Sequence, residues 1–333
     1  MSVTLITGGA GYIGGHVSWA CADAVRRFVV IDNLSTGSRK SLPPGTVFVE
    51  ADISDDAALV SAIRDNGVTS IMHFAGSTVV PDSVADPASY YTNNTVNSLK
   101  LLRVALACGV NHMIFSSTAA VYAPAMEGLV TEDSPLRPEN PYGRSKLMFE
   151  QMLADAAAAY DFRYIALRYF NVAGADPAGR VGQSTPNATH LIKVAAQAAL
   201  GVRPEMFIFG DDYATPDGTC IRDFIHVSDL ADAHMLALGY LENGGRSQTL
   251  NCGYGVGISV REAIAGMERA SGARIPIRLA PRRPGDAPRI VADSTRLKKT
   301  LAWRPQHADL DEIVKSALEW ERSLSAPTGE SAR

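Results

Sequence analysis

The segment that most constrains the fold of this chain lies at its start. Val3–Ile6 is a short apolar run with β-branched residues, and residues 7–14 then read Thr-Gly-Gly-Ala-Gly-Tyr-Ile-Gly. A strand, a glycine turn and a helix start in this order are the setting in which backbone N–H groups bind phosphate. We expect Gly8 to allow the tight turn, Gly11 to let the backbone approach a pyrophosphate, and Gly14 to let the helix pack closely on the sheet. The alternative is an ordinary glycine-rich loop.

A second expected strand ends in a carboxylate. The run Phe28–Asp32 is apolar up to Asp32, which follows Gly14 by 18 residues. An acid at this place accepts hydrogen bonds from the adenosine ribose and repels a 2′-phosphate, which favours NAD over NADP. Asp32 and Asn33 could instead form only a turn after the strand. The whole strand, glycine turn, helix and strand pattern favours a dinucleotide site that takes NAD.

Strand-like and helix-like stretches alternate through the first half of the chain. They lie at residues 46–50, 55–66, 70–74, 87–108, 111–117, 141–159 and 163–170. Such alternation predicts an α/β fold with a doubly wound (Rossmann) parallel sheet and helices on both faces. Ligands of such sheets bind at the carboxyl ends of the strands.

Two segments directly after expected strands are further candidates for the cofactor site. Asp52 and Ile53 are expected beside an adenine, and Phe74, Ala75 and Gly76 along the cofactor. The alternative is that both segments are simple connecting loops.

The alternating pattern loosens after about residue 171, where glycine, proline and asparagine become more frequent. We expect an NAD-binding Rossmann domain at 1–170, with a segment near 220–242 that returns to it. Residues 171–219 and 243–333 are expected to form a smaller mixed α/β substrate domain.

Tyr142 and Lys146 are the candidates for the reacting groups. They lie four residues apart at the start of an expected helix, so both side chains share one face. A free tyrosine has a pKa of about 10, so only roughly one in a thousand is phenolate at neutral pH. A nearby ammonium and an oxidised nicotinamide would lower this pKa, and a shift of about 3 units takes roughly 4 kcal/mol. The pair predicts a general base for an alcohol proton; the alternative is a surface tyrosine beside a solvated lysine.

The composition excludes several classes of function. The formal charge of −4 and the pI near 6.0 argue against nucleic acid or an anionic membrane as the main partner. The first strand is expected from residue 3, so we expect no signal peptide, and no apolar run approaches the length of a membrane span. The four cysteines form no C-x-x-C and the seven histidines no H-E-x-x-H, so we expect a cytoplasmic protein without a metal site.

Motifs along nearly the whole chain resemble those of the extended short-chain dehydrogenases/reductases and, more narrowly, the UDP-glucose (UDP-galactose) 4-epimerases. They are TGGAGYIG (7–14), DNLSTG (32–37), HFAGS (73–77), YYTNN (90–94), FSSTAAVY (115–122), PYGRSKLMFEQ (141–151), LRYFNVAGA (167–175), GTCIRDFIHVSDLADAH (218–234) and APRRPGDAP (280–288). The resemblance implies an isomerase that epimerises C4 of a UDP-hexose with bound NAD. Tyr142 would take the 4-hydroxyl proton while the C4 hydride passes to NAD; the 4-keto sugar would then turn over and take the hydride back on its other face.

The resemblance also implies roles for individual residues. Catalysis would rest on Tyr142, Lys146 and Thr118, whose hydroxyl would bond the sugar 4-oxygen. The residues expected to bind NAD are Gly8, Gly11, Tyr12, Ile13, Asp32, Asn33, Asp52, Ile53, Phe74, Ala75, Gly76, Asn93, Ser116, Tyr142, Lys146 and Tyr169. Those expected to bind the UDP-sugar are Thr118, Tyr142, Phe170, Asn171, His190, Leu191, Phe207, Arg222, Arg283, Asp286 and Ile290. Arg282 is the alternative to Arg283, because the two are adjacent.

Some features of the sequence leave alternatives open. Thr78 stands where many members of the family have a lysine near the cofactor phosphates, and His190 stands where an asparagine is common. A dehydratase would normally place an acid next to Thr118, whereas Ala119 follows here. A related UDP-sugar 4-epimerase that takes N-acetylhexosamines or pentoses, and a non-catalytic NAD-binding regulator, are further readings.

Two expectations concern the sugar pocket and the oligomeric state. In the family a bulky tyrosine at the position of Ile290 restricts the pocket, so a smaller, stiff isoleucine predicts a wider one. The expected helices at 90–108 and 142–159 carry more apolar positions than one buried face requires, which favours a homodimer built from these helices. These positions are Val96, Leu99, Leu102, Met148, Met152 and Ala156. The alternative is that both helices face only the core.

Overall fold

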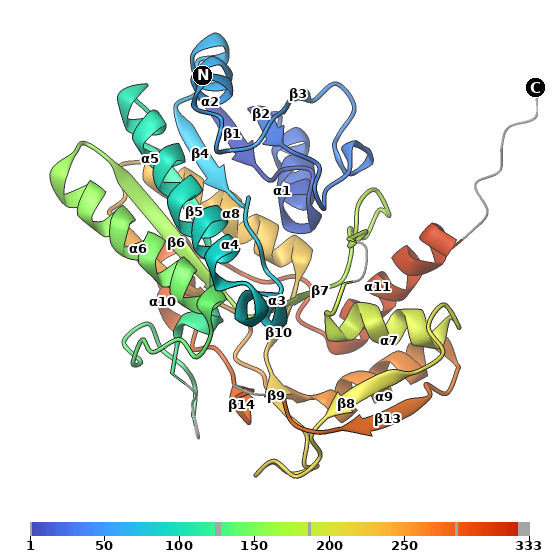
Figure 1. Ribbon diagram of the computed structural model, residues 1–333. Coiled ribbons are helices and arrows are strands. Elements are labelled where there is room, and N and C mark those ends of the chain that lie inside the picture. Colours follow the sequence, from blue (N-terminus) through green and yellow to red (C-terminus); the bar gives the residue numbers. More distant parts are fainter. Residues whose placement is uncertain (1, 124–127, 186–187, 284–285, 326–333) are drawn as a thin grey trace, which may run out of the picture.

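The protein is described by a computed structural model that covers residues 2–123, 128–185, 188–283 and 286–325 (Figure 1). Among these residues, seven parallel strands form one sheet in the order β11-β6-β5-β4-β1-β2-β3. The strands are β1 (Val3–Thr7), β2 (Arg27–Asp32), β3 (Val47–Glu50), β4 (Ser70–His73), β5 (His112–Thr118), β6 (Arg163–Tyr169) and β11 (Gln248–Cys252). The order reverses between β1 and β4, which is where ligands of such sheets bind. The predicted fold class is confirmed.

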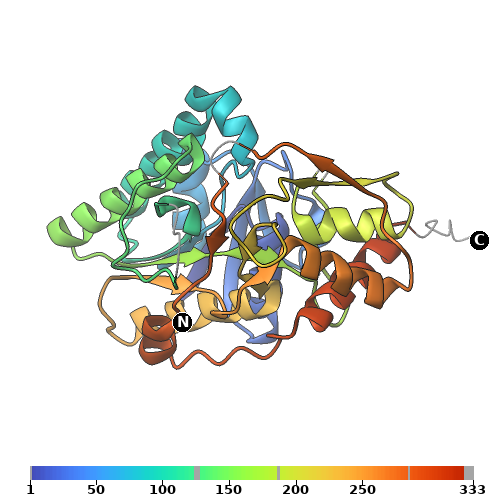
Figure 2. The same cartoon turned by 90° about the horizontal axis from the view of Figure 1, so that it is seen from below.

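Helices cover both faces of this sheet (Figure 2). On one face lie α2 (Asp56–Asn66), α5 (Asn97–Ala107) and α6 (Pro141–Ala159). On the other lie α1 (Tyr12–Asp23), α8 (Val227–Glu242) and α10 (Thr295–Leu301). Successive strand residues supply the two cores: Leu5 packs toward α2 and α5, whereas Ile6 packs toward α1 and α8.

Local sequence signals explain where α6 begins. The Asn140 side chain accepts a hydrogen bond from the Gly143 N–H at 2.9 Å, and Pro141 occupies the first helical turn. These signals place Tyr142 and Lys146 in the first two turns of the helix, at the carboxyl end of the sheet.

The expected single helix at 87–108 is interrupted. The structure has α4 (Pro87–Tyr91), a π-helical turn (Thr92–Val96) and then α5, with α3 (Val80–Ala85) just before. Single π turns inside helices are frequent at functional sites. Short 3₁₀ turns lie at Arg39–Ser41 and Ala119–Val121.

A second group of elements packs beside the sheet around α7 (Leu191–Ala199), α9 (Val260–Ser271) and α11 (Leu310–Ser325). Its strands are short: β7 (Asn171–Ala173), β8 (Met206–Phe209), β9 (Ile221–Arg222), β10 (Phe224–His226), β12 (Ile258–Ser259), β13 (Ile277–Ala280) and β14 (Arg289–Ile290). They pair as β10-β7, β13-β8 and β12-β9-β14.

The boundary between the expected domains differs from the sequence reading in one respect. Residues 243–333 were expected in the substrate domain, whereas β11 is the edge strand of the main sheet and α10 packs on its helical layer. In the returning segment, β10 pairs with β7 rather than with the main sheet, while α8 packs on α1. The division into two domains stays a prediction. No helix in the described part of the chain is long and apolar enough to cross a membrane.

Candidate active site

The glycine loop after β1 has no room for a side chain at Gly8 or at Gly14. Gly8 has a φ of +68°, and a Cβ there would lie 2.6 Å from the Ala75 backbone nitrogen. A Cβ on Gly14 would lie 2.3 Å from the Gly8 carbonyl oxygen, so the close approach of α1 to the turn after β1 requires a glycine here. Gly11 is the N-cap of α1, and no side chain in the described part of the protein caps this helix. The helix N-terminus therefore keeps free N–H groups and its positive dipole end for an anion.

Asp32 ends β2 beside this loop. Its Oδ2 accepts the Ala10 N–H at 3.0 Å and its Oδ1 accepts the Leu34 N–H at 2.8 Å. Burial raises the pKa of Asp32, and these two hydrogen bonds oppose that shift. A carboxylate has about four lone-pair sites, so Asp32 can still accept hydrogen bonds from a ligand.

The next two candidates meet across neighbouring strand ends. The Asn33 amide donates to Asp52 Oδ2 at 2.6 Å, which joins the two segments expected around the adenosine. The Ile53 side chain is buried in the core, so only its backbone is available to a ligand.

Asn94, which the sequence analysis missed, holds the loop after β4. Its Oδ1 accepts the Ser77 N–H at 2.7 Å, and its Nδ2 donates to Ser77 O and to Ser145 Oγ on α6. Its neighbour Asn93 donates to Ser77 Oγ at 2.9 Å, so Asn93 contacts the support of the loop. A Cβ on Gly76 would lie 3.0 Å from Asn94 Oδ1. The available signal was a pair of asparagines, which are poor helix formers, inside an expected helix.

The three predicted catalytic residues come together at the carboxyl end of β5. Thr118 is the last residue of β5, and its hydroxyl is close enough to the Tyr142 hydroxyl, in the first turn of α6, to lower the pKa of that phenol. Lys146 Nζ donates to the Ser116 carbonyl at 3.2 Å. The Ser116 hydroxyl has no hydrogen-bond partner in the described chain, although the Tyr169 hydroxyl lies beside it. An unpartnered buried hydroxyl is available to a ligand.

Burial controls the charges of these groups. It raises the pKa of Tyr142, with a smaller increase from Tyr169 and a decrease from the Thr118 hydroxyl. Burial also lowers the pKa of Lys146 to about 8, against the opposing effect of Glu150. The expected fall of the Tyr142 pKa depends on two positive charges near the ring, the Lys146 ammonium and an oxidised nicotinamide. Within the protein itself this pKa rises, because desolvation of the phenolate is the largest effect.

Three of the residues expected to bind the UDP form a charged group, which lies in the second group of elements. Asp286 Oδ2 accepts from Arg283 Nε at 2.8 Å, and Asp286 Oδ1 lies 3.4 Å from Arg222 Nη2. Arg222 also donates to the Ala287 carbonyl at 2.8 Å. Arg282 pairs instead with Asp212, at 2.7 Å, so Arg283 is the one of the two arginines that shares Asp286 with Arg222.

Two aromatic side chains lie next to this group on β8. Phe207 and Phe209 are both partly exposed, with ring centroids 6.1 Å apart, and the Arg283 guanidinium lies 4.8 Å from the Phe209 ring centroid. The sequence analysis named Phe207 and missed Phe209. Residues two apart on a strand share a face, and this periodicity could have identified it.

Ile290 lies near the catalytic residues. It packs on a small apolar cluster that includes Ala119, which follows Thr118, together with Tyr122 and Phe170. Asn171 follows Phe170 and begins β7. The structure therefore brings the expected sugar-pocket residues Phe170 and Ile290 beside the end of β5.

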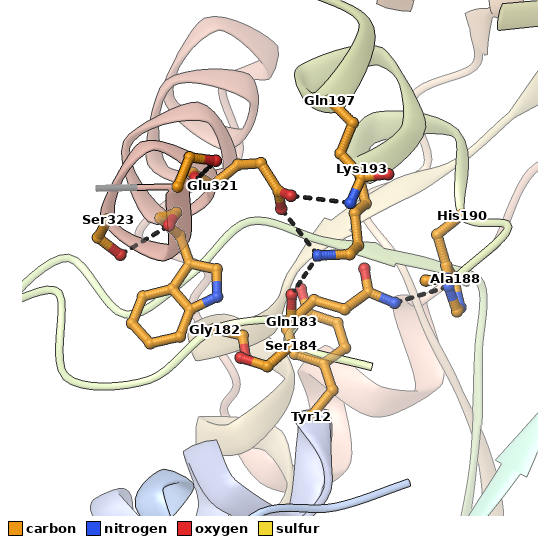
Figure 3. A network of polar contacts seen from close by, with 12 residues as sticks. Tyr12, Gly182, Gln183, Ser184, Ala188, His190, Lys193, Gln197, Glu321 and Ser323 are labelled. Atoms are coloured by element: carbon orange, nitrogen blue, oxygen red, sulfur yellow. Dashed lines mark hydrogen bonds and ion pairs between the residues drawn. The ribbon is translucent and has the colours of Figure 1, made fainter. Parts of the chain in front are cut away.

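His190, the N-cap of α7, belongs to a separate polar network (Figure 3), and Leu191 is the first residue of that helix. The His190 ring bonds to the Gln183 amide at 2.7 Å, and Lys193 Nζ donates to the Gln183 carbonyl at 2.7 Å. Lys193 also forms a buried ion pair with Glu321 of α11 at 2.7 Å. This network connects Gln183 and His190 with α7 and α11.

The comparison with known proteins bears on this site. The profile of the NAD dependent epimerase/dehydratase family matches residues 4–253. The chain belongs to this family.

The chain is also similar to individual members of the NAD dependent epimerase/dehydratase family over nearly its whole length. It is 57% identical to the UDP-glucose 4-epimerase of Azospirillum brasilense over 326 residues, 98% of this chain and 94% of that one. It is 42% identical to the Brucella ovis UDP-glucose 4-epimerase solved in complex with NAD, with a TM-score of 0.92 over 96% of this chain and 98% of that one. It is 46% identical to the UDP-Glc/GlcNAc 4-epimerase of Campylobacter jejuni, with a TM-score of 0.85 over 97% of this chain and all of that one (100%).

The residues present fit the dinucleotide of the NAD dependent epimerase/dehydratase family. Gly8 and Gly14 leave a cradle that a Cβ would fill, the N-terminus of α1 is uncapped by side chains, and Ser116 presents an unpartnered hydroxyl. The family profile ends at residue 253, directly after β11, so it covers the whole parallel sheet. Which residues contact the cofactor stays a prediction.

Proposed function

We propose that this protein is an isomerase that interconverts UDP-galactose and UDP-glucose by NAD-dependent epimerisation at C4. The observation that carries the proposal is the meeting of Thr118, Tyr142 and Lys146 at the carboxyl end of β5, on the side of the sheet where the glycine loop lies. The relatives that match over nearly the whole chain carry UDP-glucose 4-epimerase names. This arrangement of side chains and the names of the relatives together support a reaction in which one alcohol carbon is oxidised and then reduced again.

NAD would be held along the carboxyl edge of the sheet. The N–H groups at the start of α1 would bind the pyrophosphate, Asp32 the adenosine ribose, and Lys146 the nicotinamide ribose. The chemistry that NAD supplies when bound is reversible hydride transfer at C4 of the sugar. Asn94 Oδ1 accepts the Ser77 N–H and lies so close to Gly76 that a Cβ there would be 3.0 Å away. Asn94 would thereby fix the loop after β4 at the carboxyl edge of the sheet.

Tyr142 would move the proton of the 4-hydroxyl group. Because burial raises the pKa of Tyr142, its phenolate requires positive charge close to the ring. Lys146 is one source, and the oxidised nicotinamide is the second. The Thr118 hydroxyl would donate to the same phenolate oxygen and orient the sugar 4-oxygen.

The nucleotide would be anchored far from the reacting carbon. The guanidinium groups of Arg222 and Arg283 match phosphate oxygens, and Asp286 holds both in place while it offers a carboxylate to ribose hydroxyls. Phe207 and Phe209 would flank the base. A firmly held diphosphate lets the sugar turn over without leaving, because binding energy is used away from the reacting carbon.

The proposal is tested by incubating the purified protein with UDP-galactose without added NAD. We expect conversion to UDP-glucose, since NAD held from expression suffices for a redox-neutral reaction. A 4-keto-6-deoxy product would mean a dehydratase, and binding of UDP-galactose without turnover would mean a non-catalytic regulator. Either result would refute the proposal.

We further propose that the sugar pocket accepts UDP-N-acetylhexosamines, and UDP-pentoses, in addition to the glucose pair. Ile290 packs beside Phe170 and the end of β5, and an apolar wall discriminates against a methylene-sized difference by only about 1–3 kcal/mol. The similar Campylobacter jejuni enzyme is named for both UDP-Glc and UDP-GlcNAc. Ile290→Tyr should suppress turnover of the N-acetyl sugar and spare the glucose pair. An unchanged ratio of kcat/KM for the two sugars would remove Ile290 as the gate.

We propose that the protein forms a homodimer through α5 and α6, which lie side by side on one face of the sheet (Figure 1). Of the six expected interface positions, Leu102 and Ala156 are buried in the core and do not contribute. Val96, Leu99 and Met148 are at least 37% exposed, and large exposed apolar side chains on neighbouring helices favour a partner. A strictly monomeric mass at micromolar protein would contradict this proposal.

We also propose a cytoplasmic location, which the four free cysteines support because a reducing compartment leaves thiols unpaired.

A further inference from the structure

A buried ion pair lies directly behind the candidate active site. Glu150 follows Lys146 by one helical turn on α6 and pairs with Arg168 of β6. Arg168 Nε lies 3.0 Å from Glu150 Oε1, and Arg168 Nη2 lies 2.5 Å from Glu150 Oε2. Each side chain is only 5% exposed. Such a pair costs desolvation free energy, so its stabilising effect alone does not account for its presence.

The partners of this pair adjoin the site residues on three elements. The Ser117 hydroxyl, next to Thr118 on β5, donates to Glu150 Oε1. Arg168 itself precedes Tyr169 on β6. One carboxylate thus ties α6 to β5 and β6, the three elements that carry Tyr142, Lys146, Thr118 and Tyr169.

The network continues away from the site. Arg168 Nη1 donates to the Tyr122 hydroxyl at 2.9 Å, and Tyr122 donates to Asn251 Oδ1 of β11 at 2.6 Å. The Asn251 N–H in turn donates to Glu132 Oε1 at 2.8 Å. Glu132 is a second buried carboxylate, at the far end of the network from Lys146.

We propose that Glu150 is a positioning residue for the Tyr142–Lys146 pair: its contacts with Arg168 and Ser117 fix α6 against β5 and β6, and its negative charge lies one helical turn from Lys146. This inference rests on the proposed function, because it assigns Glu150 a task in the same proton transfer. It assigns a role in catalysis to a residue that does not touch the sugar.

Among the described residues, Glu150 is the acid whose charge raises the pKa of Lys146, and Glu150 is itself paired with the Arg168 cation of β6. The Lys146 ammonium donates to the Ser116 carbonyl and lies 4.9 Å from the centroid of the Phe115 ring, both on β5. It also lies close to the Gly76 backbone in the loop after β4. His73 on β4 stays neutral, since burial and then Lys146 lower its pKa to about 3. Tyr142 and Tyr169 are phenols whose pKa values burial raises.

The sign of the effect follows from the groups named above. Burial lowers the pKa of Lys146 to about 8, and Glu150 opposes that shift. The ammonium exists below its pKa. Loss of the Glu150 charge therefore lowers the pH above which Lys146 becomes neutral.

The test compares the pH dependence of two quantities. The first is kcat for UDP-galactose, measured in the NAD-loaded protein. The second is the dissociation constant of NAD, measured by adding NAD to the NAD-free protein, which does not require turnover. For Glu150→Gln we expect the alkaline limb of both profiles to move to lower pH by about 1 unit. Glu150→Asp, which keeps the charge, should leave the limb within a few tenths of a unit of the wild-type position.

Glu132→Gln is the matched control, because it removes a buried carboxylate from the same network far from Lys146. It should leave both limbs in place. If Glu150→Gln lowers kcat by the same factor at every pH and does not move the alkaline limb of the NAD dissociation constant, Glu150 is only structural and the proposal fails. If Glu150→Gln does not fold, Glu150→Gln/Arg168→Met, which leaves no unpaired buried cation, carries the same comparison. An inactive wild type with a shifted NAD limb in the variant would refute the epimerase function but not the role of Glu150.

Discussion

Replacing Gly14 by alanine tests the glycine cradle most directly. Gly14 lies in the first turn of α1, and Gly239 lies in the last turn of α8. In a helix alanine is ordinarily more favourable than glycine by about 0.5–1 kcal/mol. At Gly239 a Cβ meets nothing within 4 Å, so that gain should be realised. At Gly14 the new Cβ would lie 2.3 Å from Gly8 O and 2.8 Å from Gly9 Cα.

The magnitude at Gly14 follows from these distances. Ordinary contact for a Cβ begins near 3.4 Å, so the loop backbone must shift by about 1 Å. Overpacking of this kind costs about 1–3 kcal/mol, which exceeds the helix gain. We expect Gly14→Ala to lose about 1–2 kcal/mol of unfolding free energy, whereas Gly239→Ala should gain up to about 1 kcal/mol. The displaced N–H groups should also weaken NAD binding by about tenfold, equivalent to 1.4 kcal/mol.

Denaturant unfolding and fluorescence titration with NAD measure both effects in the two variants. The Gly239→Ala control should bind NAD as the wild type does. If Gly14→Ala is as stable as the wild type and binds NAD equally well, the loop yields without loss, and the close approach of Gly14 to Gly8 has no functional meaning.

Three further predictions address the site and the core. Tyr142→Phe should keep NAD and the fold but lose about 10²–10⁴-fold in kcat, because only the proton-transferring oxygen is removed; near-wild-type conversion of UDP-galactose would contradict the assignment. Arg222→Lys should weaken UDP binding in calorimetry by about tenfold and leave NAD affinity unchanged, since an ammonium cannot replace the fork that contacts Asp286; equal UDP affinity would exclude this role. Burial lowers the pKa of His73 and of His226 from 6.5 to about 3, so the unfolded state binds protons first as the pH falls below 6.5. The stability that their neutral forms contribute is complete above pH 6.5 and is lost toward pH 3, on the order of 2 kcal/mol for each histidine at about pH 5. Urea midpoints that do not change between neutral pH and about pH 5 would refute this linkage.

Much of the candidate site was predictable because its signals are local. The glycine spacing at residues 7–14 requires a tight turn wherever the chain goes next, and the structure confirms a strand, a loop and a helix there. The positions of Tyr142 and Lys146 follow from helical periodicity and from the Asn140 cap. Their protonation is not predictable in the same way, because it depends on how deeply the fold buries them: burial raises the pKa of Tyr142, and the expected positive charges would act against that rise.

The residues that the sequence analysis missed act through contacts between distant segments. Asn94 matters because α6 and the loop after β4 pack against it, and Glu150 because Arg168 and Ser117 converge on it from two strands. The spacing of residues along the chain does not predict such contacts.

By itself, the sequence determined the alternation of strands and helices, the glycine loop and the placement of Tyr142 and Lys146 on one helical face, because periodicity and turn chemistry act over a few residues. Only the tertiary structure decided that β11 closes the edge of the main sheet, that Asp286 is shared by Arg222 and Arg283, and that Gly14 is confined by Gly8. Those outcomes depend on which buried surfaces fit together, and a close-packed interior selects one arrangement among many that the local pattern allows.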